Sequence, residues 1–373
     1  MIIISILFFT YLITIVVFTY GFDKMEDFTT KKNKSKTKFS IIIPFRNEAD
    51  RLHDLLNSIE KLNYPTEFFE FIFVDDDSID DSCAIIKRFF ENTQNDIRVL
   101  KNIRTSNSPK KDAITTALKA STKEWIITTD ADCILPTNWL KSFDNYIQQN
   151  ECNMIVAPVT YITKHSFLHQ FQLLDFLSLQ ASTISGFGLQ NPFLCNGANL
   201  GYRKEVFKKV DGFENNNSIA SGDDIFLLEK FLQFDKTKVN YLKSDEAIVK
   251  TFPVNTFNDL LNQRVRWASK TANYNLLFGK LIGIIVFIGN GIIILLPLLV
   301  LYQLIPLLSA ISYLSMKLFF DFLLIERITN FHKQKLHFYN YFFSSILYPY
   351  FSLLVVLKSL FSSYKWKGRT FKM

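Results

Sequence analysis

Three long apolar segments lie in the terminal regions of the chain, and shorter apolar runs fill the region between them. Residues 2–22 carry no charge and are long enough to cross a bilayer core of about 30 Å as a helix. Residues 281–316 also lack charged side chains, and their 36 residues exceed one crossing, which predicts two helices with a break near YQLIP. Residues 338–360 form the third segment. The pattern therefore predicts transmembrane helices on both sides of a central domain.

The same pattern divides the chain into six parts. They are an apolar anchor (1–22), a basic linker (23–38), a central domain (39–275), two transmembrane helices (281–325), a basic loop (326–337) and a third hydrophobic segment with a basic tail (338–373). A cleaved signal peptide is the alternative for the anchor, but that segment has neither a basic leading region nor an A-x-A-like cleavage site.

Charge indicates on which side of a membrane these parts lie. Six lysines follow the anchor between residues 24 and 38, and such a flank stays in the cytoplasm. We therefore expect a multi-pass protein of the inner, cytoplasmic membrane with a cytoplasmic central domain. A full crossing by 338–360 would place the basic tail YKWKGRTFKM outside, so either this segment is re-entrant or interfacial, or the rule fails at this end. Anionic membrane lipids account for the net charge of +7, so we expect no nucleic-acid partner.

The central domain reads as an α/β fold. Four short apolar runs, 39–45, 69–76, 97–102 and 124–130, alternate with stretches of helical periodicity. Nearly continuous apolar strands at this spacing predict βαβ units and a mainly parallel, Rossmann-like sheet with both faces covered. Ligands of such sheets bind beyond the carboxyl ends of the strands.

Acidic residues gather where the second and fourth runs end. Asp75 and Asp76, with Ser78 close by, follow the second run, and Asp130 and Asp132 follow the fourth. Strand-end turns and helix caps are the alternative explanation, since Asp is common in both. Two acidic clusters at one sheet edge, however, call for a cation or a hydrogen-bonding ligand.

Seven motifs in register resemble family 2 glycosyltransferases of the GT-A fold, over about residues 39–270. They are SIIIPFRNEADRL, FVDDDSIDDS, KKDAITTAL, TTDADCILPTNWL, CNGANLGYRKEVFKKVDGF, SGDDIFLLEK and QRVRW. The apolar flanks resemble those of membrane-anchored bacterial members. The resemblance implies an inverting, metal-dependent transferase of the hexosyltransferase type that uses a nucleotide-sugar donor.

The resemblance also implies roles for individual residues. The second acid of SGDD, Asp224, would be the general base, and Asp223 would support it. Asp132 and Asp130 would bind Mg²⁺ or Mn²⁺ on the donor diphosphate, because hard cations prefer oxygen ligands. Donor binding would fall to Asp75, Asp76, Ser78, Lys110, Lys111, Asp130 and Arg266, and the acceptor side to Gly197, Gln263 and Trp267. The family's Gly-Lys is Pro-Lys-Lys here, so the resemblance leaves the phosphate contact open between Lys110 and Lys111.

Further readings stay open beside these roles. QRVRW also fits a basic amphipathic helix on the membrane surface, and residues 163–188 predict an interfacial helix under the acceptor site. The function expected is sugar transfer to a lipid or cell-envelope glycan acceptor at the membrane. The alternatives are a processive polysaccharide synthase, and a non-catalytic scaffold or transporter.

Overall fold

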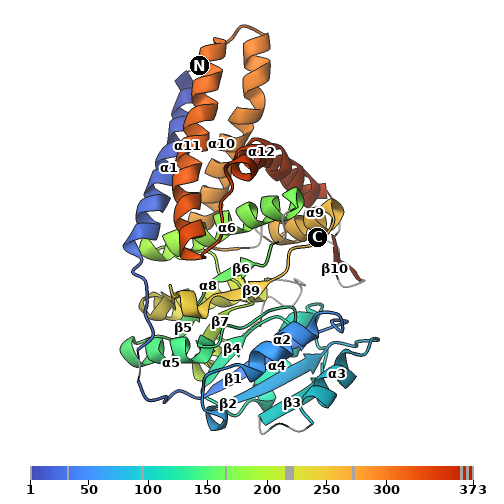
Figure 1. The fold of residues 1–373 in the computed structure, drawn as a ribbon. Helices are drawn as coiled ribbons and strands as arrows, with labels where there is room; N and C mark the ends of the chain where they lie inside the picture. The colour runs from blue at the N-terminus through green and yellow to red at the C-terminus, as the bar shows by residue number, and fades with distance from the viewer. Residues whose placement is uncertain are drawn as a thin grey trace.

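The computed structural model describes residues 2–31, 33–91, 93, 96–163, 166–214, 222–270, 274–361, 364–366 and 369–371. An α/β domain lies at one end of the molecule and a group of long apolar helices at the other (Figure 1). The N-terminal end lies at the tip of the helices, and the C-terminal end lies beside the domain.

Seven strands form the central sheet, in the order β3-β2-β1-β4-β7-β5-β8. Their bounds are β1 Phe39–Phe45, β2 Phe69–Asp75, β3 Asp96–Lys101, β4 Trp125–Thr128, β5 Met154–Val156, β7 Leu200–Arg203 and β8 Val239–Tyr241. Strands β1 to β4 are parallel, whereas β7 runs antiparallel to β4 and β5. The side chains of β1, β2 and β4 are almost all buried, as expected for a sheet covered on both faces. The predicted mainly parallel α/β fold is confirmed.

Helices cover both faces of this sheet (Figure 1). They are α2 Leu52–Glu60, α3 Ser82–Phe89, α4 Pro109–Ala120, α5 Trp139–Gln149, α7 Lys204–Lys209 and α8 Asp223–Asp235, with the short 3-10 helices η1 Thr66–Phe68, η2 Lys236–Lys238 and η3 Asp245–Ala247. The apolar stripe of α2, which includes Leu52 and Leu56, is fully buried, because its spacing places these side chains on one helix face. The four apolar runs identified in the sequence form strands β1 to β4. The bounds of these strands differ from the predicted bounds by no more than two residues at either end.

Two small sheets complete the strands. Strand β6 (Val159–Tyr161) pairs in parallel with β9 (Val249–Thr251) between the large sheet and the apolar helices. Near the C-terminus β10 (Tyr364–Trp366) and β11 (Arg369–Phe371) pair antiparallel. We call this pair the C-terminal hairpin.

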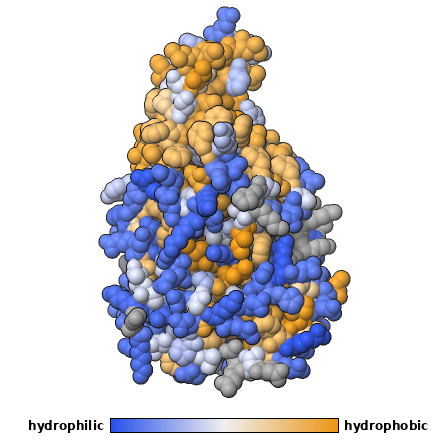
Figure 2. All heavy atoms as spheres, in the orientation of Figure 1, coloured by the Kyte–Doolittle hydropathy of each residue, from blue (hydrophilic) through white to orange (hydrophobic). Residues whose placement is uncertain are grey.

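Among the described residues, four helices are long and apolar enough to cross a membrane: α1 Ile2–Lys24, α10 Leu277–Leu301, α11 Leu307–Phe331 and α12 Phe338–Phe361. On the face shown in Figure 2, apolar residues cover most of this end of the molecule, while hydrophilic residues dominate the surface of the α/β domain. Helix α6 (Phe167–Gly188) lies across the lower ends of α1 and α11 and separates them from the sheet (Figure 1). Terminal apolar helices, part of the predicted fold class, are therefore present.

A polar cluster connects α1 to α11 within the apolar region. The Tyr11 hydroxyl donates to Oδ1 of Asp321 over 2.5 Å, and Lys317 forms an ion pair with the other carboxylate oxygen. Lys317 is 3% exposed. Because each charge has a partner, the cluster can stay buried among apolar helices.

Helix α12 differs in direction from the other three long helices. It lies at an angle to them and passes over α6 and α9 (Phe257–Ala268) (Figure 1). The ring of Phe351 packs edge-on against Phe171 of α6, with 5.1 Å between centroids, and against Phe257 of α9, with 6.0 Å. The middle of α12 therefore packs against helices α6 and α9.

Candidate active site

The acidic motifs meet at one edge of the sheet. The chain turns from β1 to β2 and β3 on one side and reaches β4 on the other, so the strand order reverses between β1 and β4. Asp75 ends β2, and Asp130 and Asp132 follow β4, which stops at Thr128. Crevices at such reversals are the usual ligand sites of open α/β sheets.

Lys110 connects two of the acidic motifs. Its Nζ lies 2.7 Å from Oδ1 of Asp130 and 3.5 Å from Oδ2 of Asp223. Pro109 opens α4, a favoured first position for proline, and places Lys110 in the first turn facing the sheet edge. Burial by itself lowers the pKa of this lysine, but Asp130 and Asp223 outweigh it and raise the pKa. Lys110 therefore stays charged and holds the two motifs together.

Asp223 and Asp224 begin α8 side by side, yet their surroundings differ. Burial raises the pKa of the Asp224 carboxyl, and the charge of Asp223 raises it further. For Asp223, burial also raises the pKa, but the ammonium groups of Lys110 and Lys270 outweigh this effect and lower it. Neighbouring carboxyls with pKa values moved in opposite directions are suited to different roles, one as a base and one as a fixed charge.

Gly197 lies directly against these carboxylates. Its N–H donates to Oδ2 of Asp224 over 3.2 Å, and its carbonyl accepts from Thr128 at the end of β4. A Cβ at this position would lie 3.1 Å from Oδ2 of Asp223 and 3.4 Å from Nζ of Lys110. Only glycine allows this close approach without displacing a neighbour.

Asp132 faces an arginine from the segment that follows β1. Its Oδ2 is 3.4 Å from Nη1 of Arg51, and its side chain is 25% exposed, against 38% for Asp130. Within the described residues, no group of three or more His, Cys, Asp or Glu side chains is arranged to hold a metal ion. Two accessible carboxylates nevertheless fit Mg²⁺ or Mn²⁺, which usually takes one or two carboxylates and completes its shell with phosphates and water.

Hydrogen bonds hold the acidic residues after β2 in a turn. Asp75 accepts from the N–H of Ser78 over 2.9 Å, and the Ser78 hydroxyl accepts from the N–H of Asn47. Asp76 is buried, and its Oδ1 accepts from Nε of Arg104 over 2.7 Å. These contacts fix the carboxylates at the carboxyl end of β2.

The two lysines of the Pro-Lys-Lys motif have different surroundings. Lys111 is 1% exposed, and its ammonium lies 4.7 Å from the ring centre of Phe226. Burial lowers the pKa of Lys111 to about 8. Lys110, in contrast, has its ammonium directly on the acidic cluster. Of the two lysines, Lys110 is therefore the one that contacts Asp130.

Sequence reasoning missed Lys270. It is buried, its side chain lies against Gly222 at the start of α8, and the charges of Asp224 and Asp223 act on it. Burial lowers its pKa to about 8. Gly222 has φ 88°, a left-handed conformation that glycine adopts readily, and thereby directs the chain into α8. Ser221 of the same motif lies outside the described residues.

Helix α9 carries the QRVRW motif. Arg264 forms a buried ion pair with Asp175 of α6, donates to Gln263 and lies over Trp267, with 4.2 Å between the guanidinium carbon and the ring centre. Arg266 is half-buried on the same helix. The sequence offered no signal for Asp175, because that residue lies 89 positions away from its partner. The ion pair fixes Gln263 and Trp267 relative to α6.

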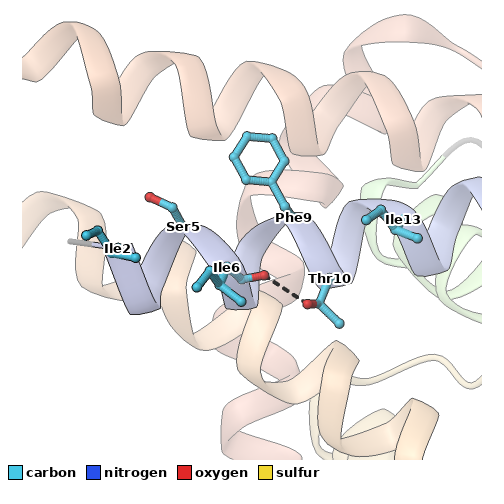
Figure 3. A pocket seen from close by; sticks show the side chains of 6 residues that line it. All are labelled: Ile2, Ser5, Ile6, Phe9, Thr10 and Ile13. Carbon is cyan, nitrogen blue, oxygen red and sulfur yellow. Dashed lines mark hydrogen bonds between the residues drawn. The ribbon is translucent and has the colours of Figure 1, made fainter.

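A groove on the outer face of α1 lies far from these polar residues. Its lining side chains, drawn in Figure 3, are Ile2, Ser5, Ile6, Phe9, Thr10 and Ile13. It lies near the N-terminal tip of the apolar helices, whereas the acids lie at the sheet edge (Figure 1). The groove is part of the apolar surface and not of the acidic site.

Comparison with known families explains why these polar residues lie together. Residues 40–211 match the family model described as Glycosyl transferase family 2. They form a family 2 glycosyltransferase domain. The match begins in β1 and ends just after α7, so it contains Lys110, Asp130 and Gly197. The resemblance drawn from the motifs is confirmed, while Asp224 and α9 lie beyond the matched residues.

Two curated relatives show how far the similarity extends. A poly(ribitol-phosphate) beta-glucosyltransferase of Bacillus spizizenii is 28% identical over 124 residues, 33% of this chain and 19% of the relative. The glycosyltransferase AglE of Haloferax volcanii is 22% identical over 228 residues, 61% of this chain and 70% of the relative. The chain spans about a fifth of the length of the first curated relatives that it matches.

The whole fold has a solved counterpart. The mannosyltransferase PcManGT of Pyrobaculum calidifontis, solved in complex with GDP-Man and Mn²⁺, superposes with a TM-score of 0.64. The superposition covers 96% of this chain and 97% of that one at 14% identity. The family 2 domain and the apolar helices thus share one arrangement with that protein.

Proposed function

We propose that the protein is a membrane-bound inverting glycosyltransferase, which moves a sugar from a nucleotide-sugar donor to a lipid or cell-envelope glycan. The observation that carries this proposal is the Lys110 bridge between Asp130 and Asp223, since it unites the donor and catalytic motifs at one sheet edge. The relatives support it by their own activities, which include transfer of glucose to poly(ribitol-phosphate).

Asp224 acts as the general base in this proposal. Its carboxylate takes the proton from the acceptor hydroxyl as that oxygen attacks the anomeric carbon, and the bond from this carbon to the diphosphate breaks. Attack from the face opposite the leaving group inverts the configuration. The raised pKa of Asp224 suits a base, and Gly197 holds one of its oxygens in place. Asp223, with its lowered pKa, remains ionised and keeps Lys110 in position.

The donor occupies the crevice between the acidic clusters. Carboxylates accept hydrogen bonds from ribose and base, and lysine and arginine bind phosphate oxygens. The donor residues are Asp75, Asp76, Ser78, Lys110, Lys111, Asp130 and Arg266. On the acceptor side, Gly197 leaves room for close approach, and Gln263 and Trp267 border the acceptor sugar or lipid head group.

Asp132 and Asp130 are the residues that would hold Mg²⁺ or Mn²⁺. When bound, such an ion would neutralise the charge that develops on the departing diphosphate. Lys110 would contribute to the same neutralisation, because its ammonium lies 2.7 Å from the Asp130 carboxylate.

We further propose that α1, α10 and α11 cross the cytoplasmic membrane while α12 lies at its inner surface. The angle of α12 and its contacts with α6 and α9 support this arrangement (Figure 1). The basic tail then stays on the side of the family 2 domain, so the positive-inside rule holds throughout. The lysines that follow α1 would contact anionic membrane lipids.

Purified protein in detergent, supplied with Mn²⁺, lipid extract and a panel of nucleotide sugars, should release nucleoside diphosphate. Absence of release with every donor would refute the transferase function. Products of one added sugar indicate a single-transfer enzyme, whereas a ladder of long products would favour a processive synthase.

The base is tested separately with Asp224→Asn. This change should lower kcat by about 10²- to 10⁴-fold, the usual contribution of a general base, while donor binding stays intact. A variant that keeps full activity would exclude Asp224 as the base.

A further inference from the structure

The carboxylate of Asp76 is held by three side chains from two distant parts of the chain. Its Oδ1 accepts from Arg104 over 2.7 Å and from Asn102 over 2.8 Å. Its Oδ2 accepts from Nη1 of Arg369 over 2.7 Å. Both oxygens of this carboxylate, which belongs to the proposed donor site, are therefore bound to protein groups.

Arg369 comes from outside the family 2 domain. It is the first residue of β11 in the C-terminal hairpin, 293 positions after Asp76. The partner strand β10 packs against α9, the helix that carries QRVRW. The hairpin thus extends from α9 to the end of β2 and lies beside both motifs.

The contact between Arg369 and Asp76 is sheltered. The Arg369 side chain is 23% exposed and that of Asp76 is 9% exposed, so solvent screens the pair only weakly. Arg104 is bound to the same carboxylate, and its Nη2 also lies 3.5 Å from Oδ2 of Asp77. A guanidinium has five N–H groups, and the bond to Asp76 uses one of those of Arg369, so the same group can also bind an anionic ligand.

On the basis of the proposed function, we propose that Arg369 is a donor-binding residue. Asp76 orients its guanidinium, and the guanidinium binds the diphosphate of the nucleotide sugar through charge-assisted hydrogen bonds. The C-terminal hairpin in this way completes the donor site, which the matched family 2 residues form only in part.

The test measures binding of UDP and GDP to the full-length protein in detergent with Mn²⁺, by calorimetry. Arg369→Ala should weaken binding of the preferred nucleotide by about tenfold to a hundredfold, as expected for loss of a charge-assisted contact. Arg369→Lys should recover only part of this loss, because lysine lacks the planar fork. The matched control is Lys358→Ala at the exposed end of α12, which should bind nucleotide like the wild type.

Enzyme kinetics provide a second readout. Arg369→Ala should raise the KM for the donor and leave the KM for the acceptor unchanged, with an unaltered melting temperature. Tighter nucleotide binding or a lower donor KM would mean that Arg369 blocks the site, and unchanged binding would mean a purely structural contact; each would overturn the inference. A wild-type protein that binds neither nucleotide and releases no nucleoside diphosphate from any donor of the panel would instead refute the proposed function.

Discussion

The backbone N–H of Gly197 donates to the carboxylate of Asp224 over 3.2 Å. Through this bond the loop before β7 fixes the first turn of α8, although the two residues lie 27 positions apart. The backbone of a neighbouring loop therefore positions Asp224, the candidate base. The residue that makes this contact, Gly197, has no side chain.

Gly197→Ala should lower kcat by about tenfold or more while the protein remains folded. The added methyl group would lie 3.1 Å from Asp223 and would displace the acidic pair by a few tenths of an ångström. The measurement is kcat together with the melting temperature. Gly283→Ala is the control, because its Cβ would meet no atom within 4 Å, and equal activity loss in both variants would contradict the prediction.

The acid limb of the pH–rate profile should lie at a higher pH than the usual pKa of an aspartate carboxyl. Asp224 must be ionised to act as a base, and since its pKa is raised, activity is lost as the pH falls through that raised value. Asp223→Asn should shift the limb to lower pH, because it removes the negative charge that raises the pKa of Asp224. Profiles of kcat/KM check both statements; a limb that moves upward would exclude the coupling.

Chelation of divalent cations should abolish transfer, and Mn²⁺ or Mg²⁺ should restore it. Asp132→Asn should raise the half-saturating Mn²⁺ concentration by about tenfold or more, which corresponds to about 1.4 kcal/mol of binding free energy. Titration of free Mn²⁺ by electron paramagnetic resonance in the presence of UDP gives a readout that is independent of turnover. Full activity in the chelator would rule out metal dependence.

Breaking the buried ion pair between Asp175 and Arg264 should destabilise the protein. Asp175→Asn leaves an uncompensated buried charge, so the free energy of unfolding should fall by about 3–5 kcal/mol. The double variant Asp175→Leu/Arg264→Met should recover much of that loss, because no charge remains buried.

Denaturant unfolding in detergent measures these changes. The control is Glu205→Gln, which breaks the solvent-exposed pair with Lys209 and should leave stability unchanged. A double variant less stable than Asp175→Asn would contradict the explanation by buried charge.

Much of the fold could be read from the sequence because its signals are local. Apolar runs such as 39–45 became buried strands, and the spacing of Leu52 and Leu56 became the buried face of α2. The motifs also identified most candidate site residues, since short segments at strand ends carry them. The antiparallel strand β7 was not foreseen, because pairing direction depends on which strands the chain brings together.

The sequence by itself determined the α/β class, the long apolar helices and the family 2 motifs, because periodicity, length and residue type are properties of neighbouring positions. Only the tertiary structure decided that Lys110, and not Lys111, lies against Asp130, that α12 lies at an angle to the other apolar helices, and that Arg369 reaches Asp76. The physical reason is that these contacts join segments far apart in the chain. Their geometry follows from the packing of whole helices and sheets, which no local pattern records.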